Sequence, residues 1–250
     1  MPTEPQVCLF TIRGEFGHWR KWFTTTSALT YSFPPRTALI GMIGAILGIQ
    51  RHKVPKVFPL SATRIAVCPL ARIEKDMFPI KWRQSPPEIG GRVFRLNKMV
   101  ESFQENLEVV RRPNFLIAFW HQEEKLLKEL VERLKNKRWF YPPYLGIMGF
   151  LADVEWTGYD VAEEIRVDGA DIVSVLPLSE QSSKKVDLSE SENIIREERV
   201  PLEVFPQRTF SHLFLAYLSR EAKPIVVKVQ QGMALFKLRN SGHVIAFFEQ

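Results

Sequence analysis

The apolar positions in the first part of the chain follow the periods of strands and helices in turn. Short runs that alternate or are fully apolar, rich in Val, Ile and Phe, are typical of strands. Leucines spaced three and four apart are typical of an amphipathic helix. The predicted order is strand, helix, strand, strand, helix, strand, over residues 7–13, 34–48, 63–73, 114–120, 122–134 and 147–156.

This order of elements is that of the ferredoxin-like, or RRM-type, fold, which belongs to the α+β class. The second and third strands of that fold normally share a short hairpin, whereas here about 40 residues, 74–113, separate them. The insertion is basic and also carries Phe78, Trp82, Phe94 and Met99. Long loops of compact domains often carry function, so we expect a long β-hairpin that projects as a thumb. The alternative is a surface loop that binds no ligand.

The remainder of the chain changes character. Residues 161–175 are acidic with short β-prone pieces, residues 179–198 are polar and expected to form an exposed loop, and residues 224–248 resemble strands joined by turns. The sequence therefore predicts two domains. Residues 1–156 form an RRM-like domain with its thumb insertion at about 74–113, and residues 157–250 form a small, mostly β domain.

Charge is distributed unevenly along the 250 residues. The formal net charge is +6, but residues 1–150 carry 23 Lys and Arg against 12 Asp and Glu, whereas residues 151–250 carry 11 against 16. A local basic excess of this kind is the electrostatic footprint of a polyanion-binding protein. The alternative is a basic face that is simply solvated.

Several classes of protein are disfavoured by the sequence. Cys8 and Cys68 each lie in an apolar run and are predicted to be buried thiols of a reducing compartment. No C-x-x-C or H-E-x-x-H motif occurs, so we expect no metal and no cofactor. The N-terminus lacks the pattern of a signal peptide, and no apolar run approaches the roughly 20 residues that span a bilayer. The expectation is a cytoplasmic protein without a membrane partner.

Aromatic and cationic residues gather around glycines near the N-terminus. Residues 14–21 read GEFGHWRK, and residues 31–48 read YSFPPRTALIGMIGAILG. The second stretch predicts a helix with Arg36 and Thr37 in its first turn, and free N–H groups at a helix N-terminus bind anions. Aromatic rings beside cations suit a charged, base-bearing ligand. Together these features favour RNA binding.

These two stretches resemble the N-terminal signature of the Cas-five (Cas5) family of CRISPR-associated proteins, and residues 141–153, YPPYLGIMGFLAD, resemble its second motif. The resemblance implies an RRM-like domain with a thumb and a variable C-terminal β domain. It implies a subunit of a type I surveillance complex (Cascade) in antiviral defence, which caps the backbone filament and holds the 5′ handle of the guide RNA (crRNA). The implied partners are crRNA, the backbone subunit of the Cas-seven type, the large subunit, and target DNA through the complex.

The expected mechanism is RNA binding without chemistry. The cations are assigned to phosphates, the aromatic rings to unstacked bases, and the glycines to close approach of the backbone. The residues expected to contact RNA are His18, Trp19, Arg20, Lys21, Arg36, Thr37, Arg83, Arg92, Arg95, Lys98, Tyr144, Gly146 and Gly149.

Structural alternatives exist for most of the aromatic and cationic candidates. Trp19 and Trp22 could be core aromatics, and His18 could bond a loop carbonyl. Arg36 could cap a neighbouring strand, and Tyr144 could pack under the sheet.

The main rival function is that of an enzyme, because one branch of the resembled family cleaves precursor repeat RNA without metal. Such a metal-independent endoribonuclease needs a general base and a general acid. The available groups are His18, Lys21, Tyr31, His52 and His121. The enzymes of that branch use a Tyr together with a Lys-His dyad, and this sequence does not place these residue types at the spacing that the branch shows. An ordinary RRM protein is a further alternative, although the sequence has no match to the RNP1 motif.

Overall fold

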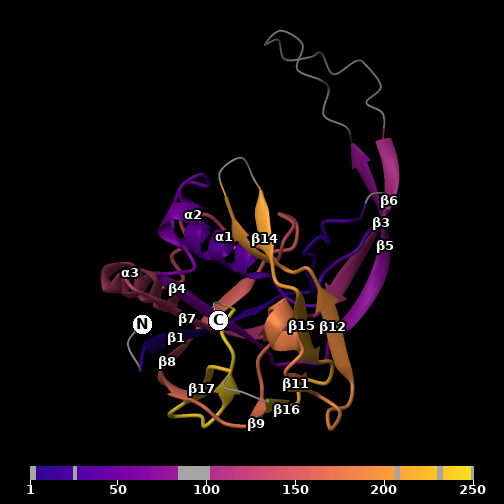
Figure 1. Cartoon of the computed structure of the whole chain (residues 1–250). Coiled ribbons are helices and arrows are strands. Elements are labelled where there is room, and N and C mark those ends of the chain that lie inside the picture. Colours follow the sequence, from indigo (N-terminus) through magenta and orange to yellow (C-terminus); the bar gives the residue numbers. More distant parts are fainter. Residues whose placement is uncertain (1–3, 25–26, 84–101, 206–208, 230–232, 249–250) are drawn as a thin grey trace.

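Figure 1 shows the computed structural model of the chain, which describes residues 4–24, 27–83, 102–205, 209–229 and 233–248. It is rich in strands and has few helices, so the predicted α+β class is confirmed. The elements in chain order are β1 (Gln6–Arg13), β2 (Phe16–Gly17), β3 (Ser27–Ala28), α1 (Arg36–Leu47), α2 (Val54–Val57), β4 (Thr63–Pro69), β5 (Glu74–Arg83), β6 (Ser102–Arg111), β7 (Asn114–His121), α3 (Glu124–Lys135), β8 (Asp153–Ile165), β9 (Gly169–Ile172), β10 (Leu176–Leu178), α4 (Glu180–Ser183), β11 (Val186–Asp187), β12 (Ile194–Glu198), β13 (Pro201–Val204), β14 (Phe210–His212), β15 (Leu215–Ser219), β16 (Ile225–Val229), β17 (Leu235–Leu238) and β18 (Val244–Ile245).

A nine-stranded sheet runs through the described part of the chain in the order β11-β16-β9-β18-β17-β8-β1-β7-β4. Its β8-β1-β7-β4 part is antiparallel throughout, with Cys8 of β1 opposite Phe119 on one side and Tyr159 on the other. Strands β10, β15 and β12 form a second sheet, and β13 pairs with β14. In Figure 1, α1, α2 and α3 lie together on one side of the β4-β7-β1-β8 strands.

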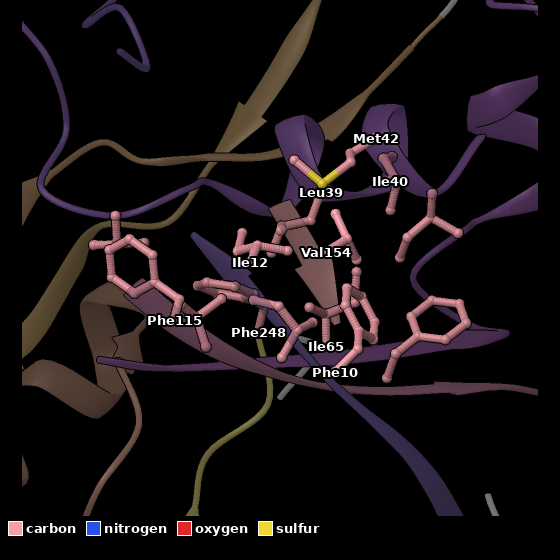
Figure 2. Packing of buried hydrophobic residues seen from close by; sticks show 14 of the residues in the cluster. Phe10, Ile12, Leu39, Ile40, Met42, Ile65, Phe115, Val154 and Phe248 are labelled. Atoms are coloured by element: carbon pink, nitrogen blue, oxygen red, sulfur yellow. The ribbon is translucent and has the colours of Figure 1, made fainter. Parts of the chain in front are cut away.

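The main core lies between these helices and the sheet (Figure 2). Inward-facing residues of the central strands, such as Phe10 and Phe115, meet Leu39 and Ile40 of α1. Each of these side chains is at most 1% exposed, and fully burying one such side chain contributes about 1.5–3 kcal/mol. The predicted leucine stripe of α3 is buried in the same core.

Helix α1 begins after Pro35 and ends at Gly48, close to the predicted bounds. Gly48 has a φ of 76°, the left-handed conformation that commonly ends a helix. Gly44 allows α2 to approach, because a Cβ atom there would lie 2.8 Å from Val54 Cγ2. Gly41 has open space around it, so the three glycines do not form one tight contact face.

Strands β5 and β6 fall within the predicted insertion and form an antiparallel hairpin, paired from Glu74↔Arg111 to Arg83↔Ser102 (Figure 1). Strand β6 also pairs with β2 and β3, so the base of the hairpin is attached to the segment between β1 and α1. Residues 84–101 lie outside the described residues.

Two predicted elements are wrong. The apolar run at 147–156 becomes a strand only from Asp153, where β8 begins, because residues 147–152 form bends and turns in which Met148 and Leu151 are exposed. The polar stretch at 179–198 is not a loop, since it contains α4, β11 and β12. The predicted domain boundary at residue 156 falls inside β8, which continues to Ile165; the division into two domains stays a prediction.

Both cysteines are free and buried, as the sequence predicted. Burial raises the pKa of both thiols, to about 12 for Cys68. Within the described ranges, no helix combines the length and apolar character needed to cross a bilayer.

Candidate nucleic-acid interface

The segment between β1 and α1, which we call the signature segment, is attached to the base of the β5–β6 hairpin. Its described residues are 14–24 and 27–35. His18 Nδ1 lies 2.7 Å from the carbonyl oxygen of Glu108, and since a carbonyl accepts, Nδ1 carries the proton. The Thr30 amide donates to Glu108 Oε2 at 2.8 Å, and Lys75 Nζ donates to the Thr30 carbonyl at 2.6 Å. The signature segment is therefore held by side chains of both hairpin strands.

The second sequence motif packs directly against the first. The His18 amide donates to the Leu145 carbonyl at 3.0 Å, and the Leu145 amide donates to the Phe150 carbonyl at 2.7 Å. Gly146 has a φ of 88°, and a Cβ atom there would lie 1.7 Å from the His18 carbonyl oxygen. This close backbone approach requires glycine, so the two motifs form one structural unit.

A buried carboxylate joins this unit to the C-terminal part of the chain. Glu197 of β12 is 2% exposed, and its Oε1 accepts hydrogen bonds from the Ser32 amide at 3.0 Å and the Ser32 hydroxyl at 2.5 Å. Lys21 Nζ lies 2.6 Å from Oε2, an ion pair rather than an aligned hydrogen bond, and Lys75 Nζ lies 3.5 Å from Oε1. Two cations from distant parts of the sequence thus converge on one acid.

Beside Glu197 lies a cavity of about 510 Å³ that we call the basic cavity. Its wall combines the signature segment, the start of β5, the end of β6, β12 and the residue after β15. Its charged lining residues are Lys21, Arg72, Lys75, Arg111, Arg196, Arg220, Glu74 and Glu197. The lining thus carries six cations against two acids, a composition that suits a polyanion.

Two arginines at the rim of the basic cavity are only loosely paired. Arg72 lies 3.4 Å from Glu221, and Arg111 lies 3.8 Å from Asp76, with both arginines about half exposed. Exposed ion pairs of this kind contribute about 0–1 kcal/mol. A phosphate can therefore replace the acidic partner of either arginine with little loss of stabilising free energy.

The predicted aromatic contacts differ in exposure. Trp19 is 4% exposed and packs edge-on against Phe115 with ring centroids 6.0 Å apart, and His18 is equally buried. Burial lowers the pKa of His18, because the charged imidazolium loses hydration. Tyr144 is exposed, so among these three rings it is the one that the structure leaves open to a base.

The predicted cations near the N-terminus are engaged within the chain. Arg20 lies 3.6 Å from Glu105 and donates to the Thr24 carbonyl, whereas Lys21 pairs with Glu197 inside the basic cavity. Of these two, Lys21 is the one that the structure places in the basic cavity.

The first turn of α1 is covered by the chain itself. Arg36 is 1% exposed, and its guanidinium donates to the carbonyls of Phe58 at 3.0 Å and Leu202 at 3.4 Å. Arg36 thus bonds the C-terminal end of α2 and strand β13, so its guanidinium is engaged inside the chain, as in the alternative interpretation in which it bonds a neighbouring strand. Thr37 is half-buried beside it.

Of the remaining predicted residues, the structure describes Gly149 and Arg83. Gly149 has open space around its Cα atom, unlike Gly146. Arg83 lies at the end of β5, where its backbone pairs with Ser102. Arg92, Arg95 and Lys98 lie outside the described residues.

Sequence reasoning missed most of the basic cavity. Arg72, Arg111, Arg196 and Arg220 come from four separate places in the chain, two of them in its acidic half. No local spacing connects them. Lys75 and Arg111 had a weak signal, since both belong to the basic insertion at about 74–113.

Of the five groups considered for catalysis, His52 is exposed, and the other four have partners within the chain. His121 Nδ1 accepts from the Glu123 amide at 3.0 Å, and Nε2 donates to the Val57 carbonyl at 2.9 Å. The Tyr31 hydroxyl is buried and donates to the Arg199 carbonyl at 2.7 Å, and burial raises its pKa. Among the described residues, no group of three or more His, Cys, Asp or Glu side chains could hold a metal ion.

Comparisons with known proteins add an independent finding. A family model described as a CRISPR-associated protein (Cas5) matches residues 7–213. A CRISPR protein from Archaeoglobus fulgidus is similar in structure, with a TM-score of 0.55 and 13% identity over 96% of this chain and 98% of that one. A CRISPR RNA-guided surveillance complex contains a chain with a TM-score of 0.47 and 14% identity, covering 89% of this chain and 90% of that one. A search of curated proteins finds no match.

Proposed function

The chain belongs to the Cas5 family of CRISPR-associated proteins, and from this premise we propose that it is a non-catalytic, RNA-binding subunit of a CRISPR surveillance complex. The observation that carries the proposal is the basic cavity, where six cations from five parts of the chain surround a space of about 510 Å³. Its ligand in this proposal is the 5′ handle of crRNA, whose phosphates replace the loose acidic partners at the rim. By holding the handle, the subunit caps the backbone filament of a type I (Cascade) complex in antiviral defence.

The ferredoxin-like description of the fold is part of the same proposal. It is supported by the order β8-β1-β7-β4, antiparallel throughout, with α1 following β1 and α3 following β7. The β5–β6 hairpin corresponds to the proposed thumb, which would follow the guide backbone. Because its base forms one wall of the basic cavity, RNA held there would continue along the hairpin.

The proposed protein partners are the backbone subunit of the Cas-seven type and the large subunit, with target DNA bound through the assembled complex. A protein neighbour is supported by apolar side chains that face solvent in the second motif, including Met148 at 80% exposure and Leu151. Clustered exposed apolar side chains commonly mark protein contacts.

The absence of catalysis is also a proposal. It is supported by His18, His121 and Tyr31, which are buried and have ring or hydroxyl groups bonded to backbone partners. A general base must reach the proton that it removes, and these three groups face the protein interior. Incubating the purified protein with labelled repeat RNA in EDTA tests this, and a product with a 2′,3′-cyclic phosphate would overturn it.

The binding proposal is tested by measuring the affinity for single-stranded repeat RNA as a function of salt. We expect log K to fall linearly with log salt, and the slope to shrink by about 0.7 for each phosphate contact removed. The double variant Arg72→Ala/Arg220→Ala should weaken binding and flatten the slope. The matched control is Lys128→Ala/Arg166→Ala, which removes two exposed cations from other surfaces. Equal slopes for the two double variants would remove the basic cavity from the interface.

A further inference from the structure

An exposed tryptophan lies next to the basic cavity. Trp22 was interpreted as a core aromatic, but it is 54% exposed, and its neighbour Phe23 is 53% exposed. Trp22 follows Lys21, which lines the cavity and pairs with the buried Glu197. Two adjacent exposed aromatic side chains beside a cavity form an apolar patch, and such patches commonly mark contact sites.

The turn that carries Trp22 is well fixed. The Lys21 amide donates to the Leu29 carbonyl at 2.8 Å, and the Lys21 carbonyl accepts from the Thr24 hydroxyl at 2.9 Å. The indole therefore extends from a hydrogen-bonded turn.

Three side chains lie around the indole, two of them from a distant part of the chain and one from the adjacent residue. The Arg199 guanidinium lies over the Trp22 ring, 5.6 Å from its centroid. The His212 ring centroid is 6.0 Å away at an interplanar angle of 50°, and the Phe23 ring is 5.9 Å away and nearly perpendicular. We call these four residues the aromatic platform. Burial and the nearby Arg199 lower the pKa of His212, which favours an uncharged ring.

The backbone of Arg199 supports a specific arrangement. Its φ is 48°, a left-handed conformation that is uncommon for residues other than glycine. Its amide donates to the Phe214 carbonyl at 3.2 Å and its carbonyl accepts from the Tyr31 hydroxyl at 2.7 Å. Such conformations persist where the surroundings fix them and are frequent at ligand sites.

The aromatic platform is continuous with the basic cavity through two short segments. Lys21 and Arg196 line the cavity, and Trp22 and Arg199 belong to the platform. A polyanion in the cavity therefore has aromatic rings within reach of its bases, the combination by which proteins bind single-stranded nucleic acids. A protein partner would not require the adjoining cluster of cations.

We propose that Trp22, flanked by Arg199 and His212, is a stacking platform for one unpaired base of the RNA whose phosphates lie in the basic cavity. This inference rests on the proposed function. Stacking of a base on one aromatic side chain contributes about 1–3 kcal/mol, so removing the ring should weaken RNA binding by about 5- to 150-fold.

The test places 2-aminopurine at each adenine of a single-stranded repeat RNA in turn and measures fluorescence and affinity with the full chain. We expect quenching at one position, loss of that quenching and of affinity in Trp22→Ala, and substantial recovery in Trp22→Phe. Phe140→Ala is the matched control, because Phe140 is a 59% exposed aromatic outside the aromatic platform. Thermal unfolding followed by circular dichroism checks that each variant is folded.

Each outcome separates the inference from the proposed function. If Trp22→Ala keeps its affinity and quenching while Arg72→Ala/Arg220→Ala loses affinity, the stacking inference is wrong and the proposed function stands. If neither variant changes RNA binding, the proposed function itself is wrong. If Trp22→Ala binds RNA normally but loses a protein subunit from the complex, the aromatic platform is a protein interface and the inference is overturned.

Discussion

Replacing Glu197 with alanine should unfold the contact between the N-terminal signature segment and β12. The carboxylate accepts two hydrogen bonds from Ser32, and it faces the ammonium groups of Lys21 at 2.6 Å and Lys75 at 3.5 Å. Alanine would leave the Ser32 donors and the Lys21 ammonium without this acceptor at a position where Glu197 itself is almost fully buried, whereas Lys75 would keep the Thr30 carbonyl and Glu108 as partners.

The expected magnitude follows from this burial. Removing one partner of a buried ion pair typically costs about 3–5 kcal/mol, because the other charge remains buried and unpaired. Lys21 and Lys75 are partly exposed, with 19% and 25% of their side chains accessible, so both can recover some hydration. We therefore expect a loss of about 3 kcal/mol, a large part of the 5–15 kcal/mol that stabilises a typical protein.

The assay is urea unfolding followed by circular dichroism, with Glu198→Ala as the matched control. Glu198 is adjacent in β12 and pairs with Arg196 at 2.8 Å, but both side chains are more than half exposed. Exposed pairs contribute about 0–1 kcal/mol, so the control should unfold near the wild-type midpoint. Equal losses of unfolding free energy in the two variants would refute the role assigned to Glu197.

Three further predictions concern stability and reactivity. Gly146→Ala should lower the free energy of unfolding by about 1–2 kcal/mol for the left-handed φ alone and by more for the clash with the His18 carbonyl, as urea unfolding would show. His18 has a pKa below its usual 6.5, so the unfolded state binds more protons and stability should fall as pH drops below about 6.5; His18→Gln should flatten that dependence. Cys8 and Cys68 should react with Ellman's reagent at the rate of unfolding, because both thiols are buried and their pKa values are raised; immediate reaction of the native protein would contradict this.

Local patterns predicted the elements that bury one regular face. The α3 stripe repeats with the helical period, and β7 is a short, continuous apolar run, so a short window of sequence contains each signal. Strand β12 was missed because its sequence, IIREE, is mostly charged. It is a strand because β15 pairs with it and because Ser32 and two lysines satisfy its inward-facing carboxylate, partners that no local window contains.

Apolar side chains led to a wrong prediction of burial at two exposed sites. The run that begins at Ile147 suggested a strand, yet Met148 and Leu151 face solvent. Trp22 suggested a core position for the same reason. Apolar character predicts burial only where the fold supplies a neighbour, and here the neighbours proposed are other molecules, a protein subunit for Met148 and a base for Trp22.

The candidate site could not be found from charge along the sequence, because the acidic half of the chain supplies part of it. Residues 151–250 have an excess of acidic groups, yet they contribute Arg196 and Arg220 to the basic cavity and Arg199 to the aromatic platform. Side chains alternate between the two faces of a strand, so β12 can bury the carboxylate of Glu197 and at the same time present the guanidinium of Arg196 at the surface.

This arrangement couples RNA binding to the contact between the two halves of the chain. The basic cavity exists only where β12 lies against the signature segment and the hairpin base, and that contact is held by the buried Glu197. A ligand that binds only the native arrangement stabilises it in proportion to the logarithm of ligand concentration over Kd. RNA bound in the cavity would therefore hold the signature segment, the hairpin and β12 together, and the surfaces that face the proposed protein neighbours would be fixed at the same time.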